Sequence, residues 1–162
     1  MIIRPADRGD VQEIAQIWNP MIRDTVVTFN SVEKTEDEIW SMIQSRQAAD
    51  FGFWVACQAS EMAGFVTYGQ FRGGVGYRHA MEHTIILAPT AQGWGTGRRL
   101  MATCEEHAKS FGHHTMLAGV SGENGPGITF HAKLDYELVA VIPQVGRKFG
   151  RWMDLHLMQK FL

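Results

Sequence analysis

Apolar side chains recur at helical spacing in four segments of the chain. One amphipathic helix is predicted to open at Asp10 and a second near Thr35, where the acidic turn TEDE is typical of a helix N-terminus. Further helices are predicted through residues 100–111 and 128–134. The apolar stripe of the first helix consists of Val11, Ile14, Ile17 and Trp18. That of the second consists of Ile39, Trp40 and Ile43.

Strand-like patterns fill the remaining segments. They cover residues 2–4, 53–59, 62–71, 81–89, 115–122, 137–144 and 152–162. The strands at 53–59 and 62–71 are separated by Ser60 and Glu61, which is a hairpin spacing. The order of elements predicts a three-layer α/β (α+β) fold, with a mixed sheet of about six to seven strands flanked by about four helices. We expect one domain over residues 1–162.

Composition narrows the functional classes. The 162 residues are 45% apolar and 20% charged with a net charge of −2, so we expect no nucleic-acid surface. No apolar run reaches the roughly 20 residues of a membrane span, and MIIRPADRGD lacks the pattern of a signal peptide. Cys57 and Cys104 both have apolar neighbours and are read as buried thiols. A cytoplasmic protein is expected.

The stretch AQGWGTGRRL, residues 91–100, indicates an anion site. A dinucleotide fingerprint is excluded because Arg98 stands where its third glycine belongs, and no Gly-Lys-Ser/Thr follows to make a P-loop. Glycines before a helix expose backbone N–H groups at the positive end of the helix dipole, and Arg98 and Arg99 add charge. A simple glycine-rich turn with two solvated arginines would leave the same residues.

The flanking sequence adds a resemblance. Gln92 to Gly97 match Q/R-x-x-G-x-G/A directly after EHTIILAP, which resembles the acyl-CoA loop of the GCN5-related N-acetyltransferases (GNAT). The segments IWNPMIRDTVVTFNSVEKTEDEIW, FRGGVGYRHAMEHTIILAPTAQGWGTG, AGVSGENGPGITFHAKLDYE and VGRKFGRWMDLHLMQ are similar to the phosphinothricin and methionine sulfoximine acetyltransferase branch. The resemblance implies a GNAT fold, acetyl-CoA as co-substrate, direct transfer in a ternary complex and a homodimer with a contribution from FGRW. It also implies a detoxified small L-amino acid such as phosphinothricin, methionine sulfoximine or methionine sulfone.

The resemblance also assigns a binding role to individual residues. Those implied to contact coenzyme A are Ile85, Ile86, Leu87, Gln92, Gly93, Trp94, Gly95, Thr96, Gly97, Arg98 and Asn124. The strand at 85–87 would pair through its backbone with the pantetheine arm, and one N–H freed by a bulge would stabilise the oxyanion. The residues implied on the acceptor side are Phe29, Arg72, Val75, Gly76, Tyr77 and Arg78. An arginine facing the pocket would suit a carboxylate, although each could equally be solvated.

Two residues are candidates for proton transfer. Glu82 matches the glutamate proposed as the base of the branch, acting through water; a solvated strand carboxylate is the plainer interpretation. His131 stands where the superfamily often has a tyrosine that protonates the thiolate. It could instead be structural, because a thiolate with a reference pKa of about 8.5 can leave unaided.

Three further points complete the expectations. No metal site is predicted, since a strand would separate His79 and His83 by about 13 Å. Asp135 replaces a family glycine and must tolerate a left-handed backbone, and Gly127 removes one polar contact to the cofactor. Two other functions stay open: acetylation of peptide or protein N-termini, and a catalytically silent acyl-CoA-binding domain.

Overall fold

The computed structural model describes residues 1–59 and 61–162, and its elements follow the predicted order. They are β1 (Ile2–Pro5), α1 (Val11–Asp24), α2 (Glu36–Ala48), β2 (Phe53–Gln58), β3 (Glu61–Gln70), β4 (Ala80–Leu87), α3 (Thr96–Ser110), β5 (Thr115–Ser121), α4 (Gly125–Ala132), β6 (Glu137–Lys148) and β7 (Arg151–Phe161). Ser60, half of the predicted hairpin turn, lies outside the described residues. Glu61, its other half, is already the first residue of β3.

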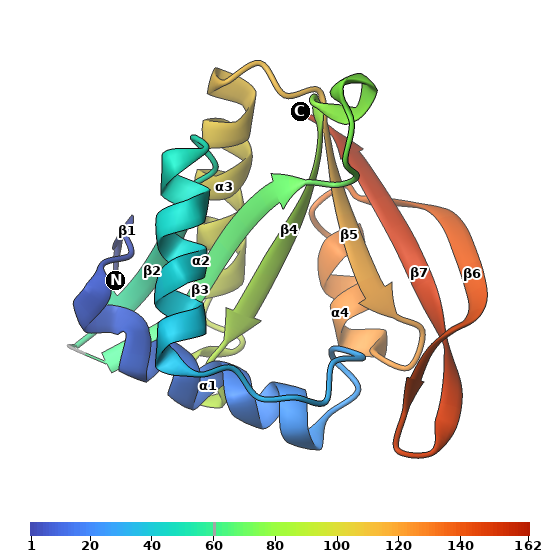
Figure 1. Ribbon diagram of the computed structural model, residues 1–162, viewed down its shortest axis with the longest axis horizontal. Coiled ribbons are helices and arrows are strands. Elements are labelled where there is room, and N and C mark those ends of the chain that lie inside the picture. Colours follow the sequence, from blue (N-terminus) through green and yellow to red (C-terminus); the bar gives the residue numbers. More distant parts are fainter. Residues whose placement is uncertain (60) are drawn as a thin grey trace.

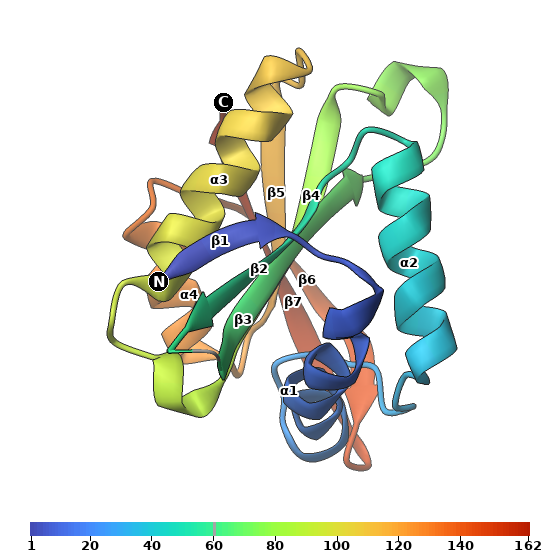
Figure 2. The same ribbon diagram turned by 90° about the vertical axis from the view of Figure 1, so that its left-hand side faces the viewer.

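The strands form one mixed sheet in the order β1-β2-β3-β4-β5-β7-β6, and among the described residues only β4 and β5 pair in parallel. Helices α1 and α2 cover one face and α3 and α4 the other (Figures 1 and 2). Each face has its own core: α1 and α2 pack against Phe53, Val55 and Phe65, whereas α3 packs against Tyr68 and its neighbours. The predicted α/β class is confirmed, with seven strands and four α-helices in the part of the chain that the structure describes.

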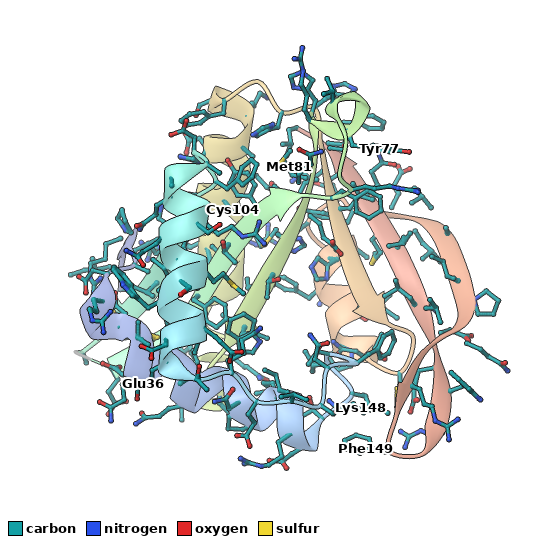
Figure 3. The ribbon with its side chains drawn as sticks, viewed as in Figure 1. Glu36, Tyr77, Met81, Cys104, Lys148 and Phe149 are labelled. Atoms are coloured by element: carbon teal, nitrogen blue, oxygen red, sulfur yellow. The ribbon has the colours of Figure 1, made fainter. Side chains whose placement is uncertain are left out.

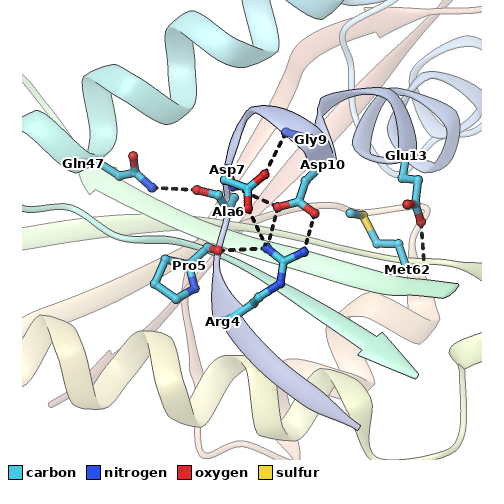
Figure 4. A network of polar contacts seen from close by, with 9 residues as sticks. All are labelled: Arg4, Pro5, Ala6, Asp7, Gly9, Asp10, Glu13, Gln47 and Met62. Carbon is cyan, nitrogen blue, oxygen red and sulfur yellow. Dashed lines mark hydrogen bonds and ion pairs between the residues drawn. The ribbon is translucent and has the colours of Figure 1, made fainter. Parts of the chain in front are cut away.

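A charged network fixes α1 against β1 (Figure 4). The Arg4 guanidinium donates two hydrogen bonds of 2.7 Å to the Asp10 carboxylate, which also accepts the Asp7 N–H at 2.8 Å. Asp7 in turn caps a short 3₁₀ turn, Arg8–Asp10, that precedes α1. The helix that the sequence opens at Asp10 is therefore entered through this turn, with Asp10 buried beneath it.

The strand predicted at 137–144 continues to Lys148, as β6 at the edge of the sheet. Its pairing with β7 shifts register twice, between Leu138 and Ala140 and between Ile142 and Gly146. The second shift spans Pro143, which has no N–H to donate and is tolerated at an edge or a bulge. The proline therefore interrupts the ladder without ending the strand.

The central feature of the sheet is the separation of β4 from β5. Their pairing runs only from Ala80↔Thr115 to Glu82↔Leu117, after which the two strands diverge (Figure 1). On its other side β4 stays paired with β3 as far as Leu87. One edge of β4 therefore has backbone groups facing an open wedge.

Candidate active site

The wedge contains a cavity of about 360 Å³. It is lined by α1 and the connection that follows it, by β4, β5 and β7, and by α4 with its N-cap. The lining residues that matter below are Trp18, Phe29, Glu82, His83, Ile85, Gly119, Asn124 and His131. A second cavity of about 420 Å³ lies beside it and shares Val27, Ile85, Ile86, Asn124 and His131. Two ligands could therefore meet at β4.

Backbone hydrogen bonding identifies which groups of β4 face the wedge. Phe71 N–H donates to the Ala80 carbonyl and Ala88 N–H to the Ala63 carbonyl, and the pairing between these points has no register shift. Antiparallel pairing alternates, so the even-numbered residues of β4 bond to β3. The N–H and C=O groups of Ile85 and Leu87 point toward the wedge, whereas Ile86 directs its backbone to β3. The predicted bulge is absent from this stretch; divergence of the strands frees the N–H groups instead.

Glu82 lies on the face of β4 that is covered by α1 and α2. A β-carbon at Gly119 of β5 would be only 2.9 Å from its Oε1, so the glycine leaves room for this carboxylate. Burial raises the pKa of Glu82 above its ordinary value, and the nearby Arg46 charge offsets part of that effect. A partly buried carboxylate with a raised pKa, lining a cavity, has the properties of a general base.

His131 does not lie free in the cavity. Its Nδ1 is 2.7 Å from the Gly127 carbonyl oxygen, and its Nε2 is 2.9 Å from Nε2 of His83. The Nδ1 of His83 is 2.9 Å from the Leu117 carbonyl oxygen. Both rings are buried, so the chain of contacts ties β5, β4 and α4 together. For His131 to protonate a ligand directly, its ring must leave one of these contacts.

The protons available to this pair are too few for its contacts. A carbonyl oxygen only accepts, so each Nδ1 must carry a proton. Burial lowers the pKa of His83 to about 3, with the neighbouring ring adding to the effect, and burial likewise lowers the pKa of His131. The neutral pair holds two protons for three contacts, which leaves the Nε2–Nε2 contact without one.

His83 escaped the sequence interpretation, which considered it only as a metal ligand paired with His79. The structure places His79 in the turn before β4, and His83 on the strand itself. Strand alternation next to Glu82 was the available signal, because it turns adjacent side chains to opposite faces. Among the described residues, no group of three His, Cys, Asp or Glu side chains is placed to hold a metal ion.

The glycine loop borders the second cavity and leads into α3. Gly93 and Gly95 have φ values of 82° and 79°, in the left-handed region that favours glycine. Thr96, the first residue of α3, lines the cavity, and its buried hydroxyl has no hydrogen-bond partner among the described residues. A ligand acceptor group would satisfy it, as well as the free N–H groups of the helix start.

Most of the residues expected to bind coenzyme A line this second cavity. These are Ile85, Ile86, Leu87, Gln92, Gly93, Gly95, Thr96, Gly97, Arg98 and Asn124. Trp94 differs: it is 74% exposed and is not among the lining residues. Arg99 also points elsewhere, because its guanidinium approaches the Met1 carbonyl oxygen at 3.4 Å. Asn124 accepts the Gly127 N–H at 3.0 Å and thereby caps α4.

The residues expected on the acceptor side separate into two places. Phe29 lines the first cavity, and a β-carbon at Gly146 of β6 would overlap its ring. The others, Arg72, Val75, Gly76, Tyr77 and Arg78, are exposed in the connection from β3 to β4 and line neither cavity. Figure 3 shows Tyr77 at the far end of the sheet, and the Arg72 guanidinium lies 5.5 Å from its ring centre.

Lys148 anchors the connection that carries Phe29. Its ammonium group donates hydrogen bonds of 2.6, 2.6 and 2.8 Å to the carbonyl oxygens of Ile22, Thr25 and Thr28. The side chain reaches there from the end of β6, beside Phe149 (Figure 3). Buried cations need such partners, so this lysine fixes the wall of the first cavity. Nothing in the local sequence indicated the role.

Two departures from the family pattern are accommodated locally. Asp135 has a φ of 66°, so the residue that replaces a glycine does adopt the left-handed conformation. Gly127 supplies both its N–H, to Asn124, and its carbonyl, to His131.

None of the helices among the described residues is long and apolar enough to cross a membrane.

A split parallel strand pair beside a glycine loop at a helix start defines an acyl-CoA-dependent N-acetyltransferase. The chain belongs to the acetyltransferase (GNAT) family, whose model matches residues 13–136. The L-methionine sulfoximine/L-methionine sulfone acetyltransferase of Salmonella typhimurium is 33% identical over 159 residues, 98% of this chain and 93% of the relative.

Two solved structures extend the comparison. The acetyltransferase yncA from Salmonella typhimurium, solved with its cofactor acetyl-CoA, has a TM-score of 0.95 and 33% identity, and the match covers 100% of this chain and 94% of that one. A ribosomal-protein-alanine N-acetyltransferase from Brucella melitensis has a TM-score of 0.96 and 32% identity, with 100% of both chains covered.

Proposed function

We propose that this enzyme transfers the acetyl group of acetyl-CoA to the α-amino group of a small L-amino acid or analogue. Methionine sulfoximine, methionine sulfone and phosphinothricin are the acceptor types, and detoxification is the proposed purpose. The observation that carries the proposal is the meeting of the two cavities at Ile85, with Glu82 lining one of them and the glycine loop the other. Acetyl-CoA would occupy the larger cavity and the acceptor the smaller.

The proposed reaction is a direct transfer. Glu82 takes a proton from the acceptor ammonium, through water, and the amine nitrogen bonds to the thioester carbonyl carbon. The free N–H of Ile85 or Leu87 would stabilise the oxyanion as charge develops. The nitrogen then gives up its second proton to water, the C–S bond breaks, and coenzyme A departs as a thiolate that takes a proton from solvent. Departure without His131 is favoured because both nitrogens of that ring are engaged.

A small acceptor is supported by the way the first cavity is closed. Lys148 holds the last turn of α1 by one carbonyl oxygen and the α1–α2 connection by two, and Phe29 of that connection lines the cavity wall. The similarity to the Brucella melitensis protein favours a peptide N-terminus as the second candidate acceptor. A catalytically silent domain would have no use for the carboxylate that lines this cavity.

A homodimer is proposed as the assembled form. The edge strand β6, the adjoining β7 and the turn between them expose apolar side chains, which are Leu138, Val139, Val141, Ile142, Val145, Phe149, Trp152 and Phe161. A contiguous exposed apolar strand at a sheet edge usually needs a partner. Phe149 and Trp152 belong to the FGRW segment that the sequence associates with dimerisation.

The test is thiol release from acetyl-CoA across amino acids, sulfones, sulfoximines, phosphinothricin and short peptides. We expect turnover with small L-amino acids and little with peptides; turnover with peptides alone would favour the second candidate. Coenzyme A binding without turnover of any amine would overturn the proposal that this chain catalyses acetyl transfer. For the base, Glu82→Gln should lower kcat/KM by about 10²–10⁴ and remove the acidic limb of its pH profile. An unchanged profile would exclude Glu82 from that role.

A further inference from the structure

Arg46 lies beside the proposed base without being part of either cavity lining. It stands in the last turn of α2, and its side chain lies on the backbone of β3 at Gly69. A β-carbon at Gly69 would overlap Nη1 of Arg46, so the guanidinium occupies the space that any other residue would fill. This close approach gives Gly69 a specific reason to be glycine.

The strand register brings this position next to Glu82. Gly69 and Glu82 are direct partners in the β3–β4 ladder. Directly opposite residues of an antiparallel pair have their β-carbons about 4.5–5.5 Å apart on the same face. The guanidinium over Gly69 and the carboxyl of Glu82 therefore lie on one face of the sheet, side by side under α2.

Arg46 is half-buried, and among the described residues its side chain forms no ion pair or hydrogen bond within the usual distances. Burial lowers the pKa of Arg46 and Glu82 counteracts that effect, yet a guanidinium stays charged in proteins. The chain therefore keeps a partly desolvated cation near Glu82 with no carboxylate bound to it. Desolvating a cation in this way is unfavourable, and an opposite charge nearby offsets part of the cost.

The other described residues around Glu82 carry no charge. Gly119 faces it from β5, Thr84 follows it on the same face of β4, and Trp18 of α1 lines the same cavity. His83 points to the opposite face, toward His131. Arg46 is thus the charged group among the described residues that acts on the Glu82 carboxyl.

We propose that Arg46 is a positioning residue for acetyl transfer: seated on Gly69, its guanidinium supplies the positive charge that holds Glu82 as a carboxylate ready to accept a proton. The inference rests on Glu82 being the base. Arg46 itself touches neither substrate nor coenzyme A in this proposal, and it acts through the electrostatic field at Glu82.

The test is the pH dependence of kcat/KM for the best acceptor, measured in the intact enzyme. In Arg46→Gln the acidic limb should move to higher pH, because the Glu82 carboxylate loses a stabilising charge. At pH values on the acidic limb, kcat/KM of the variant should be about threefold to tenfold lower than that of the parent, whereas the plateau value should change little. Arg46→Lys should recover most of the shift. Lys109→Gln, an exposed change of the same charge in α3, should leave the profile unmoved.

Gly69→Ala tests the seat without removing the charge. The added methyl group meets only the flexible end of the Arg46 side chain, so the sheet can accept it while the guanidinium moves away. Gly69→Ala should move the limb in the same direction as Arg46→Gln, and the double variant should shift it no further than Arg46→Gln alone.

The outcomes separate this inference from the proposed function. If Glu82→Gln removes the acidic limb but Arg46→Gln leaves it in place, the proposed role of Arg46 is wrong while the role of Glu82 as base is supported. If Glu82→Gln leaves the limb intact, Glu82 is not the base, and the proposed function loses that residue independently of Arg46. A uniform loss at every pH in Arg46→Gln, not recovered by lysine, would reduce Arg46 to packing and overturn the inference.

Discussion

The buried His83–His131 pair predicts a specific loss of stability in mild acid. Burial lowers the pKa of His83 to about 3, whereas an unfolded histidine has its ordinary value near 6.5. Between pH 6.5 and 3, the unfolded chain therefore binds a proton at His83 that the folded protein does not bind. The stability linked to His83 is complete above pH 6.5, and it is lost progressively as the pH falls from 6.5 toward 3.

The size of the effect follows from these two values. At pH 5 the unfolded histidine is almost fully protonated and the folded one is not. This pH lies about 1.5 units below the pKa of the unfolded histidine, and over that range only the unfolded state binds the proton. At 1.36 kcal/mol per unit this corresponds to about 2 kcal/mol of unfolding free energy lost between pH 8 and pH 5. His131, whose pKa burial also lowers, adds to the loss in the same direction.

The perturbation is His83→Gln, which removes the titrating ring and keeps a polar group between Leu117 and His131. Urea unfolding of both proteins at pH 8 and pH 5 gives the free energies, provided that the transitions are two-state. We expect the variant to lose about 2 kcal/mol less than the parent over this interval. Comparing the two losses cancels any constant cost of the substitution. His114→Gln, at an exposed histidine, should lose as much as the parent.

Equal losses in the parent and in His83→Gln would refute the reasoning. So would an NMR titration in which the His83 ring protonates near the ordinary histidine pKa. Either result would mean that the pair takes up a third proton, shared between the two Nε2 atoms. The buried chain from Leu117 to Gly127 would then carry a positive charge below about pH 6.5.

Two further substitutions test the wall of the acceptor cavity. Lys148→Met leaves three carbonyl oxygens without their donor. We therefore expect a loss of about 2–3 kcal/mol of unfolding free energy, measured in urea, and a higher KM for the acceptor. Unchanged values for both would show that the α1–α2 connection keeps its conformation without Lys148. Gly146→Ala drives a methyl group into the Phe29 ring, and steady-state kinetics should show the acceptor KM rising about tenfold while that of acetyl-CoA stays constant. An equal rise in both constants would contradict a role for Phe29 on the acceptor side.

Local sequence predicted one part of the candidate site, the backbone conformation of the glycine loop. That conformation is a property of the glycines themselves, and Gly93 and Gly95 do adopt left-handed φ values. The expectation for Asp135 came from the family pattern, in which a glycine stands at that position. Arg72 and Arg78, which the resemblance matches to the acceptor side, are exposed in the connection that precedes β4 and line neither cavity. The arginine whose charge acts on Glu82 comes from α2.

The sequence by itself determined the order of helices and strands, the mixed sheet and the left-handed glycines of the loop before α3, because periodicity and glycine spacing act over a few residues. Only the tertiary structure decided which groups meet in the wedge. The His83–His131 contact joins residues 48 apart, and the bond from Lys148 to Ile22 joins residues 126 apart. Which side chains lie within 3 Å of one another depends on how far β4 and β5 diverge and on where α2 and α4 pack. No local pattern carries that information.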